Sequence, residues 1–391
     1  MRKLFSFLKE RQDIVLFFLS VLVVLFRLLF YDMISWDYKY HISKWYDTLK
    51  TEGFSAFSKT FSDYSPMYLY LIYFLTFIPL HGLYSVKLLS TIFDIILAFV
   101  SSRIVFRLTS DTPASKLSFL VVLSLPTVIM NSSYWAQSDM IFTTFVLLGV
   151  LNFIQKRYFL GYLFIGVAFS FKLQTVFILP AVAIITLYYL IYERKVRFLF
   201  YPILIPLVYF VSIIPSYIAG KSLVELATIY LNQTETYKDV TLSAPNIYTF
   251  IPSDFGREYS STITIIGIIL TSLITITLVV YFLINYKRIV QNNYENSIVM
   301  LFLLFALVEP YFLPRMHERY FYIADVLSVI FAFKFRDKWF LPVVVVLSST
   351  LAYIQVNILL GLVMVAVPLG VVIVWYVFYV RKVLVLETKT T

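Results

Sequence analysis

The chain has 391 residues, of which 60% are hydrophobic and 14% charged, with a net charge of +10 and no cysteine. Soluble domains are nearer half apolar and a quarter charged, so the composition argues against a soluble enzyme, a disordered protein and a nucleic-acid-binding domain. It indicates an all-α polytopic membrane protein, and we expect no nucleic-acid partner. The lack of cysteine excludes disulfides, thiolate metal sites and cysteine nucleophiles.

Apolar runs predict the membrane helices, because a span needs about 20 apolar residues. There are about twelve such runs, at 14–31, 84–106, 117–131, 139–154, 158–171, 174–192, 198–219, 263–284, 298–313, 320–333, 339–356 and 358–380. The first run lacks a small-residue cleavage site, so we expect a retained span and not a signal peptide. We expect one transmembrane domain over residues 1–391.

The apolar run at 65–80 is ambiguous, because it is short and has a proline near each end. If the 65–80 segment does not cross the membrane, most of the 32 lysines and arginines fall on the cytoplasmic side. If it crosses, every later loop changes side, and about half of these residues face outward. The positive-inside rule therefore favours a surface or re-entrant helix at 65–80. Both termini are then cytoplasmic, and the two long extracytoplasmic loops are 32–83 and 220–262.

Polar residues gather at the extracytoplasmic ends of these runs. Five clusters share that face: Trp36, Asp37 and His41; Asp63 and Tyr64; Trp135, Gln137 and Asp139; Lys172 and Gln174; and Arg315, His317, Glu318 and Arg319. A charged group near hydrocarbon costs roughly 2.5–3.5 kcal/mol on insertion scales, so such groups tend to be paired or to line a wet cavity. The clusters therefore predict one polar chamber on the outer side.

The cations in these clusters allow two interpretations. Lys172 lies between apolar segments, so it is either a lysine whose ammonium reaches the interface or a cation for an anionic ligand. Arg315, His317 and Arg319 form either an anion site suited to phosphate or an anchor for lipid headgroups. The adjoining His317 and Glu318 favour the anion site.

The acids also allow two interpretations. Asp37, Asp63 and Asp139 are each either ordinary solvated loop carboxylates or parts of the site. Asp94 lies within a span, near the helix face of Lys87, and we expect it to be structural and paired inside the helix bundle. We expect the same of Asp325.

At these clusters the chain resembles the GT-C superfamily of multi-span glycosyltransferases, which use polyprenyl-phosphate sugars. It is most similar to the bacterial branch related to the GPI- and dolichol-pathway mannosyl- and glucosyltransferases. The segments that carry the resemblance are Trp36-Asp37, Asp63-Tyr64-Ser65-Pro66, Lys87 with Asp94, 131–139, 171–174 and 316–320. Family members often have Pro where Ser65 stands and Gly where Ala136 stands; both departures are small.

The resemblance implies roles for the clustered residues. Asp37 would be the general base, and Lys172, Arg315, His317 and Arg319 would hold the donor phosphate. The sugar and acceptor pocket would contain Trp36, His41, Asp63, Tyr64, Trp135, Gln137, Asp139, Gln174 and Glu318. Some GT-C enzymes need a divalent metal such as Mg or Mn and others do not; the sequence has no compact metal-ligand spacing, so a metal stays open.

The expected function is therefore transfer of a hexose from a polyprenyl-phosphate sugar to a cell-envelope glycan or lipid-linked acceptor. One carboxylate and a few cations suffice for an inverting single displacement, whereas a glycosidase needs two carboxylates flanking the bond. The 220–262 loop, with Tyr230, Tyr237 and Tyr248, would cover the site. The alternatives are a lipid-linked sugar transporter or flippase, with a site near the bilayer midplane, and a polysaccharide polymerase or ligase.

Overall fold

The computed structural model describes residues 11–233, 239–354 and 359–386. Every regular element in these ranges is helical, and the only β-type pairing in them consists of two isolated bridges from His317 to Leu242 and Ser243. The predicted all-α class is confirmed. A helix satisfies its backbone hydrogen bonds within one segment, which hydrocarbon requires.

Each predicted apolar run is helical. In chain order the matching helices are α2 (Gln12–Arg27), α5 (Gly82–Thr109), α6 (Thr112–Leu123) with α7 (Pro126–Ile129), α8 (Asp139–Ile154), α9 (Tyr158–Phe171), α10 (Leu179–Leu187), α11 (Arg197–Phe200) with α12 (Leu204–Ile218), α15 (Ser260–Phe312), α16 (Tyr322–Lys334), α17 (Phe340–Tyr353) and α18 (Leu359–Arg381). The shorter helices outside these runs are α3 (Ser43–Glu52), α4 (Pro66–Leu75), α13 (Leu223–Gln233) and α14 (Ser253–Glu258). Residues 355, 356 and 358 of the predicted runs lie outside the described ranges.

Fewer of these helices have the length of a full span than the sequence predicts. Over the described ranges, seven helices are long and apolar enough to cross a bilayer, and the bent pair Thr112–Leu123 and Pro126–Tyr134 can supply an eighth. The pair bends by 48° at Leu125, because a residue before proline is disfavoured in the helical conformation. α8 and α9, with 16 and 14 residues, are shorter than the about 20 residues of a straight span. A count of about twelve spans stays a prediction.

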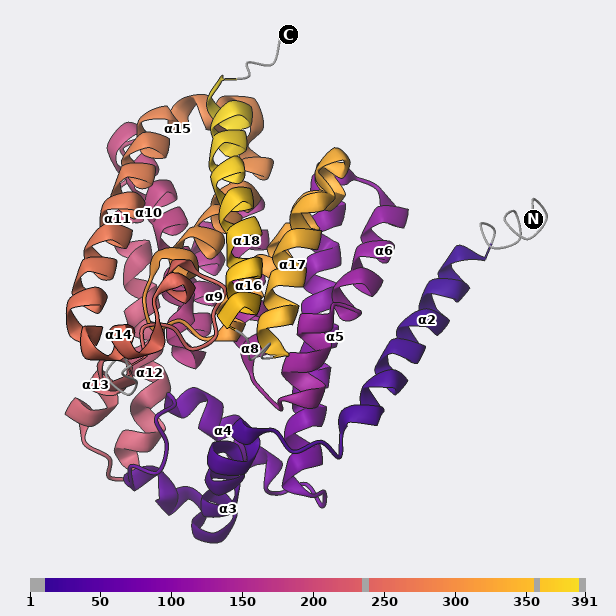
Figure 1. Ribbon diagram of the computed structural model, residues 1–391, viewed down its shortest axis with the longest axis vertical. Helices are drawn as coiled ribbons and strands as arrows, with labels where there is room; N and C mark the ends of the chain where they lie inside the picture. The colour runs from indigo at the N-terminus through magenta and orange to yellow at the C-terminus, as the bar shows by residue number, and fades with distance from the viewer. Residues whose placement is uncertain (1–10, 234–238, 355–358, 387–391) are drawn as a thin grey trace.

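α15 is two antiparallel arms, Ser260–Gln291 and Asn293–Phe312, that meet where Asn293 leaves the helical conformation. Thr275 donates to Glu309 across the arms (2.6 Å between Oγ1 and Oε1). This hairpin corresponds to the two separate runs predicted at 263–284 and 298–313. Figure 1 shows its turn at the opposite end of the molecule from α3 and α4.

The two ends of the molecule carry different loops. At the end with the α15 turn, ion pairs join segments predicted to be cytoplasmic: Arg107 with Glu295 (2.7 Å) and Arg336 with Asp111 (2.6 Å). α3 and α4 lie at the other end (Figure 1). α4 has ten residues, about 15 Å of helix, which is too short to cross the hydrocarbon core. The predicted grouping of loops is therefore present, while the side that each end faces stays a prediction of the charge rule.

A buried ion pair ties α2 to α5. Arg27 Nη1 lies 2.6 Å from Asp94 Oδ2, and both side chains are fully buried. Lys87 instead donates to the backbone carbonyls of Phe30 (2.7 Å) and Met33 (2.6 Å). Asp94 thus has a structural contact as expected, but its partner comes from the first span and not from its own helix.

Asp325, in α16, also has a partner inside the bundle. Its Oδ1 accepts a hydrogen bond from Ser349 Oγ of α17 (2.8 Å). This contact fits the structural role that the sequence predicted.

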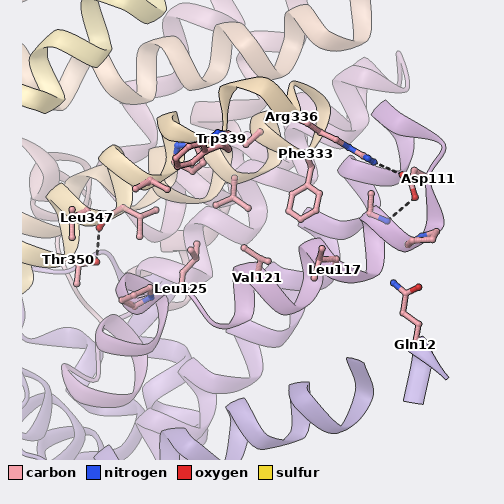
Figure 2. Close-up of a pocket in the computed structure, with 18 residues that line it drawn as sticks. Gln12, Asp111, Leu117, Val121, Leu125, Phe333, Arg336, Trp339, Leu347 and Thr350 are labelled. Carbon is pink, nitrogen blue, oxygen red and sulfur yellow. Dashed lines mark hydrogen bonds and ion pairs between the residues drawn. The ribbon is translucent and has the colours of Figure 1, made fainter. Parts of the chain in front are cut away.

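A large apolar groove of about 740 Å³ runs between α6, α16 and α17 (Figure 2). Its lining includes Leu117, Val121 and Phe333, and the Arg336–Asp111 pair lies at one end of it (Figure 2). None of the predicted site residues lines this groove, so its size does not mark it as the chemical site.

Candidate active site

A cavity of about 520 Å³, here called the outer cavity, brings four distant segments together. Its lining comes from the first outer segment, from the turn after α7, from the 220–262 loop and from the loop after α15. The lining residues are Ile34, Ser35, Trp36, Asp37, Tyr134, Trp135, Leu242, Ser243, His317, Glu318 and Arg319. Five predicted site residues therefore share one cavity with the predicted base, Asp37.

Asp37 is held by groups from two other segments. Its Oδ2 accepts a hydrogen bond from Gln137 Nε2 and lies 3.4 Å from Arg319 Nη1. The neighbouring Ser35 donates from Oγ to the backbone carbonyl of Trp135 (2.7 Å), which ties the first outer segment to the same turn. The Asp37 side chain keeps 15% of its surface exposed, so it faces the cavity and can meet a ligand.

Lys172 points into the protein. Its Nζ lies 2.7 Å from Asp139 Oδ1, and the two side chains are 6% and 1% exposed. Asn131 Nδ2 donates to the other carboxylate oxygen of Asp139 (2.7 Å), and the ammonium lies 5.4 Å from the centre of the Tyr64 ring. The interpretation of Lys172 as a lysine that reaches the interface is therefore wrong, because its charge is buried against a carboxylate.

Arg319 connects Asp37 with the buried Lys172–Asp139 pair. Its Nη1 lies 2.7 Å from Glu318 Oε1 and its Nε lies 3.9 Å from Asp139 Oδ2, in addition to its contact with Asp37. Three carboxylates thus surround one guanidinium, and Lys172 neutralises one of them. A planar guanidinium can serve several acceptors at once, which a lysine cannot.

Two titratable neighbours share the loop with Arg319. His317 Nδ1 lies 3.6 Å from Glu318 Oε2. Burial, together with the charge of Arg319, lowers the pKa of His317 below its ordinary value of 6.5. Burial alone would raise the pKa of Glu318, but Arg319 and His317 bring it down to about 2. At neutral pH Glu318 is therefore ionised, and His317 offers a hydrogen bond and not a positive charge.

A smaller cavity of about 80 Å³, here called the inner cavity, adjoins the outer one. Its lining is Asp63, Tyr64, Phe171, Lys172, Leu173, Gln174, Tyr230, Gln233, His317, Arg319 and Tyr320. His317 and Arg319 line both cavities. The clusters around Asp63 and Lys172 thus converge on the Asp37 region, as the sequence predicted.

Two predicted site residues lie elsewhere. The His41 ring packs between those of Trp36 (5.2 Å between centroids) and Trp45 (6.1 Å), and it lines a third cavity. Arg315 lines neither the outer nor the inner cavity; its backbone is left-handed (φ 61°), and its Nη2 lies 3.5 Å from Ser260 Oγ at the start of α15. The left-handed backbone turns Arg315 away from the neighbours that hold Arg319.

The segment around Leu242 and Ser243 is part of the outer cavity, although neither residue was predicted as part of the site. Leu242 donates its N–H to the carbonyl of Met316 (2.8 Å) and accepts from the N–H of Glu318 (3.1 Å). Residues 240–244 include no charged side chain, so the backbone pairing and not a charge pattern reveals the place of this segment beside the 316–318 loop.

Two tyrosines of the 220–262 loop are anchored to the bundle. Tyr230 donates from its hydroxyl to the carbonyl of Phe169 (2.6 Å), and Tyr248 to that of Phe312 (2.8 Å). Tyr237 lies outside the described residues. The loop is therefore anchored to the bundle at these two residues, and its role as a cover over the site stays a prediction.

The residues present do not favour a metal in the outer cavity. In the described part of the chain, no three acidic or histidine side chains are grouped as metal ligands. Asp37, Asp139 and Glu318 each face a cation of the protein.

The sequence model of glycosyltransferase family 87 matches residues 61–314, which is more than half of the chain. The chain belongs to glycosyltransferase family 87. This membership confirms the resemblance to membrane GT-C-type glycosyltransferases and shows that the chain uses a sugar donor and an acceptor. No curated protein matches it. In this family 87 enzyme the matched region contains Asp139 and Lys172, whereas Asp37 and Arg319 lie outside it and are connected to it by the contacts described above.

Proposed function

We propose that this glycosyltransferase moves a hexose from a polyprenyl-phosphate donor to a cell-envelope glycan or lipid-linked acceptor on the extracytoplasmic face. The observation that supports this most directly is the meeting of Asp37 and Arg319, 3.4 Å apart, in one cavity. Glycosyl transfer from a phosphate needs a base for the incoming hydroxyl and cationic or hydrogen-bonding groups for the departing phosphate. The outer cavity contains both.

The proposed reaction is a single displacement that inverts the anomeric carbon. Asp37 takes the proton of the acceptor hydroxyl while the hydroxyl oxygen forms the new bond to that carbon. The bond from the carbon to the phosphate oxygen breaks, and the phosphate leaves with the electron pair. One carboxylate acts; Asp139 is engaged by Lys172 and Asn131, so a second catalytic carboxylate of the glycosidase kind is not part of the proposal.

The phosphate would meet Arg319 and the neutral imidazole of His317, which line both cavities. Lys172 also lines the inner cavity; its charge is paired with Asp139, and its ammonium has further N–H groups that would donate to a phosphate oxygen. The position of Arg315 does not support a contact with the phosphate, because it lines neither cavity. The donor site proposed here therefore consists of Arg319, His317 and Lys172.

The sugar would lie in the outer cavity between aromatic and polar walls. Trp36 and Trp135 line it, and the buried indole Nε1 of Trp135 has no hydrogen-bond partner among the described residues. A buried donor without a partner is costly, so a ligand hydroxyl would stabilise this group. Gln137 would hold the carboxylate of Asp37 toward the acceptor.

Family membership and position both favour an enzyme over a transporter. A transporter site is expected near the bilayer midplane at broken helices, whereas Arg319 and Lys172 lie just beyond the ends of α15 and α9, and Asp37 lies in the segment before α3. A polymerase or ligase would share this arrangement, and the acceptor used in a transfer assay separates it from a hexosyltransferase.

The direct test is Asp37→Asn in a reconstituted assay with a polyprenyl-phosphate hexose. Loss of a general base typically costs about 10²–10⁴-fold in turnover, with donor binding retained. Asp47→Asn is the matched control, because Asp47 belongs to the same outer segment but is exposed and lines neither cavity. Near wild-type turnover in a folded Asp37→Asn enzyme would show that Asp37 is not the base.

A further inference from the structure

A polar cavity of about 430 Å³ lies at the end of the molecule opposite the outer cavity. It is formed where α5, α8 and α16 end beside the turn of α15. Its lining is Arg107, Leu108, Ile154, Gln155, Lys156, Gln291, Asn293, Tyr294, Glu295, Asn296 and Lys334. We propose that this cavity binds a phosphate-bearing anion, with the headgroup of an anionic phospholipid and free phosphate as the two sources of that chemistry.

The charges of the cavity leave an excess of two cations. Arg107 pairs with Glu295 (2.7 Å between Nη2 and Oε1). Lys156 and Lys334, which come from two other segments, have no carboxylate oxygen within 4.0 Å among the residues that the structure describes. Three basic residues brought together with one acid make a site for an anion, and not for a cation or a neutral ligand.

Neutral partners hold the two lysines in place without cancelling their charge. Lys156 has a left-handed backbone (φ 59°), and its Nζ lies 5.0 Å from the centre of the Tyr294 ring. The Tyr294 hydroxyl donates to the carbonyl of Phe153 (2.7 Å), which fixes the ring. Lys334 Nζ donates to the carbonyl of Leu108 at the end of α5 (2.6 Å). Each ammonium keeps further N–H groups for a ligand.

The break in α15 supplies neutral donors between the lysines. Asn293 departs from the helical conformation (φ −163°, ψ 56°), and it lines the cavity with Gln155, Gln291 and Asn296. Each side-chain amide has two N–H donors. A phosphate group has several oxygens that accept hydrogen bonds from ammonium and amide N–H groups. It can therefore use more of the donors in this cavity than a ligand with a single carboxylate can.

The position of the cavity favours a lipid headgroup. It lies at the end that carries the short basic loops, which the charge rule assigns to the cytoplasmic side. Basic pockets between membrane helices on that side bind anionic lipid headgroups. This inference does not depend on the proposed transfer reaction, because none of the cavity residues belongs to the outer or inner cavity.

The test is a binding measurement on the full chain in nanodiscs. Thermal unfolding is followed in discs of phosphatidylcholine alone, in discs containing phosphatidylglycerol, and in phosphatidylcholine discs with added inorganic phosphate. The double variant Lys156→Gln and Lys334→Gln should lose most of the stabilisation by phosphatidylglycerol, with at least about a tenfold weaker apparent affinity (1.4 kcal/mol per tenfold). Arg157→Gln is the matched control, because Arg157 is the next residue of the same turn, is exposed and does not line the cavity.

The outcomes separate the sources. Stabilisation by phosphatidylglycerol but not by millimolar phosphate assigns the site to the lipid; equal stabilisation by phosphate assigns it to the free anion. Lys156→Arg should keep the stabilisation by phosphatidylglycerol, because arginine retains the positive charge. This result would also show that a variant of this turn still folds. The proposal is overturned if Arg157→Gln loses as much stabilisation by phosphatidylglycerol as the double variant does. It is also overturned if the wild-type protein unfolds at the same temperature in all three conditions.

Discussion

Arg319 lies 3.4 Å from Asp37, although Asp37 follows the first membrane helix and Arg319 belongs to the loop after α15. The same guanidinium is 2.7 Å from Glu318 and 3.9 Å from Asp139. One side chain from the loop after α15 therefore orients the proposed base and meets the buried Lys172–Asp139 pair. This arrangement makes Arg319 the residue on which the geometry of the site depends most.

Arg319→Lys should reduce turnover by about 10²-fold or more, because an ammonium cannot reproduce the fork that faces Asp37, Asp139 and Glu318. Initial rates with a polyprenyl-phosphate hexose measure the effect. Arg315→Lys is the control from the same loop and should stay close to wild type, since Arg315 lines neither cavity. Equal losses in the two variants would mean that the loop fold, and not the Arg319 contacts, sets the rate.

The Lys172–Asp139 pair should behave as a coupled unit. Lys172→Met or Asp139→Asn alone leaves a buried group without its partner, and removing one member of a buried pair typically costs about 3–5 kcal/mol in the free energy of unfolding. The double variant should lose much less than the sum of the single variants. Denaturant or thermal unfolding in detergent gives the three values, and simple additivity would contradict the pairing.

Donor affinity provides a second measurement on the same variants. If the Lys172 ammonium donates directly to the phosphate, the double variant should bind the donor more weakly even where its stability is recovered, because neither introduced side chain replaces that ammonium. Donor binding equal to wild type would remove Lys172 from the proposed phosphate site and leave it a structural role beside Asp139.

Acid should destabilise the protein through His317 first and Glu318 later. The folded-state pKa of His317 lies below 6.5 because the imidazole is buried and faces Arg319, so the unfolded chain takes up this proton more readily. The stability that His317 contributes is complete above pH 6.5 and falls as the pH drops toward the lowered value. Glu318 contributes fully above its ordinary pKa of 4.5 and loses its contribution as the pH falls toward about 2.

Unfolding temperatures from pH 8 down to pH 4 check this order. His317→Asn should flatten the change just below pH 6.5, and Glu318→Gln should flatten the change below pH 4.5. A wild-type midpoint that rises as the pH falls from 7 to 5.5 would contradict the environment assigned to His317.

The sidedness of the site can be tested with single cysteines, because the natural chain has none. Lys44→Cys places a thiol on α3, and Arg288→Cys places one near the turn of α15; both positions are exposed. In intact cells an impermeant maleimide should label Lys44→Cys and should reach Arg288→Cys only after permeabilisation. The reverse pattern would place the outer cavity in the cytoplasm and exclude the proposed extracytoplasmic reaction.

Local sequence was sufficient for the helices. The run at 84–106 is helical over Gly82–Thr109, because hydropathy and backbone hydrogen bonding in hydrocarbon act within one segment. The same reasoning predicted that Asp37, Lys172 and Arg319 lie at one end of the bundle, since a charge near hydrocarbon must be paired, reach a helix end or face a cavity.

Partners, in contrast, were decided by tertiary structure. Asp94 pairs with Arg27 and not with Lys87, because the rotation and tilt of two packed helices determine which side chains face each other. Arg319 enters the cavities while Arg315 leaves them, because a left-handed backbone at Arg315 reverses the direction of the loop. Pairing of this kind depends on contacts between segments distant in the sequence, and no local pattern of residues encodes them.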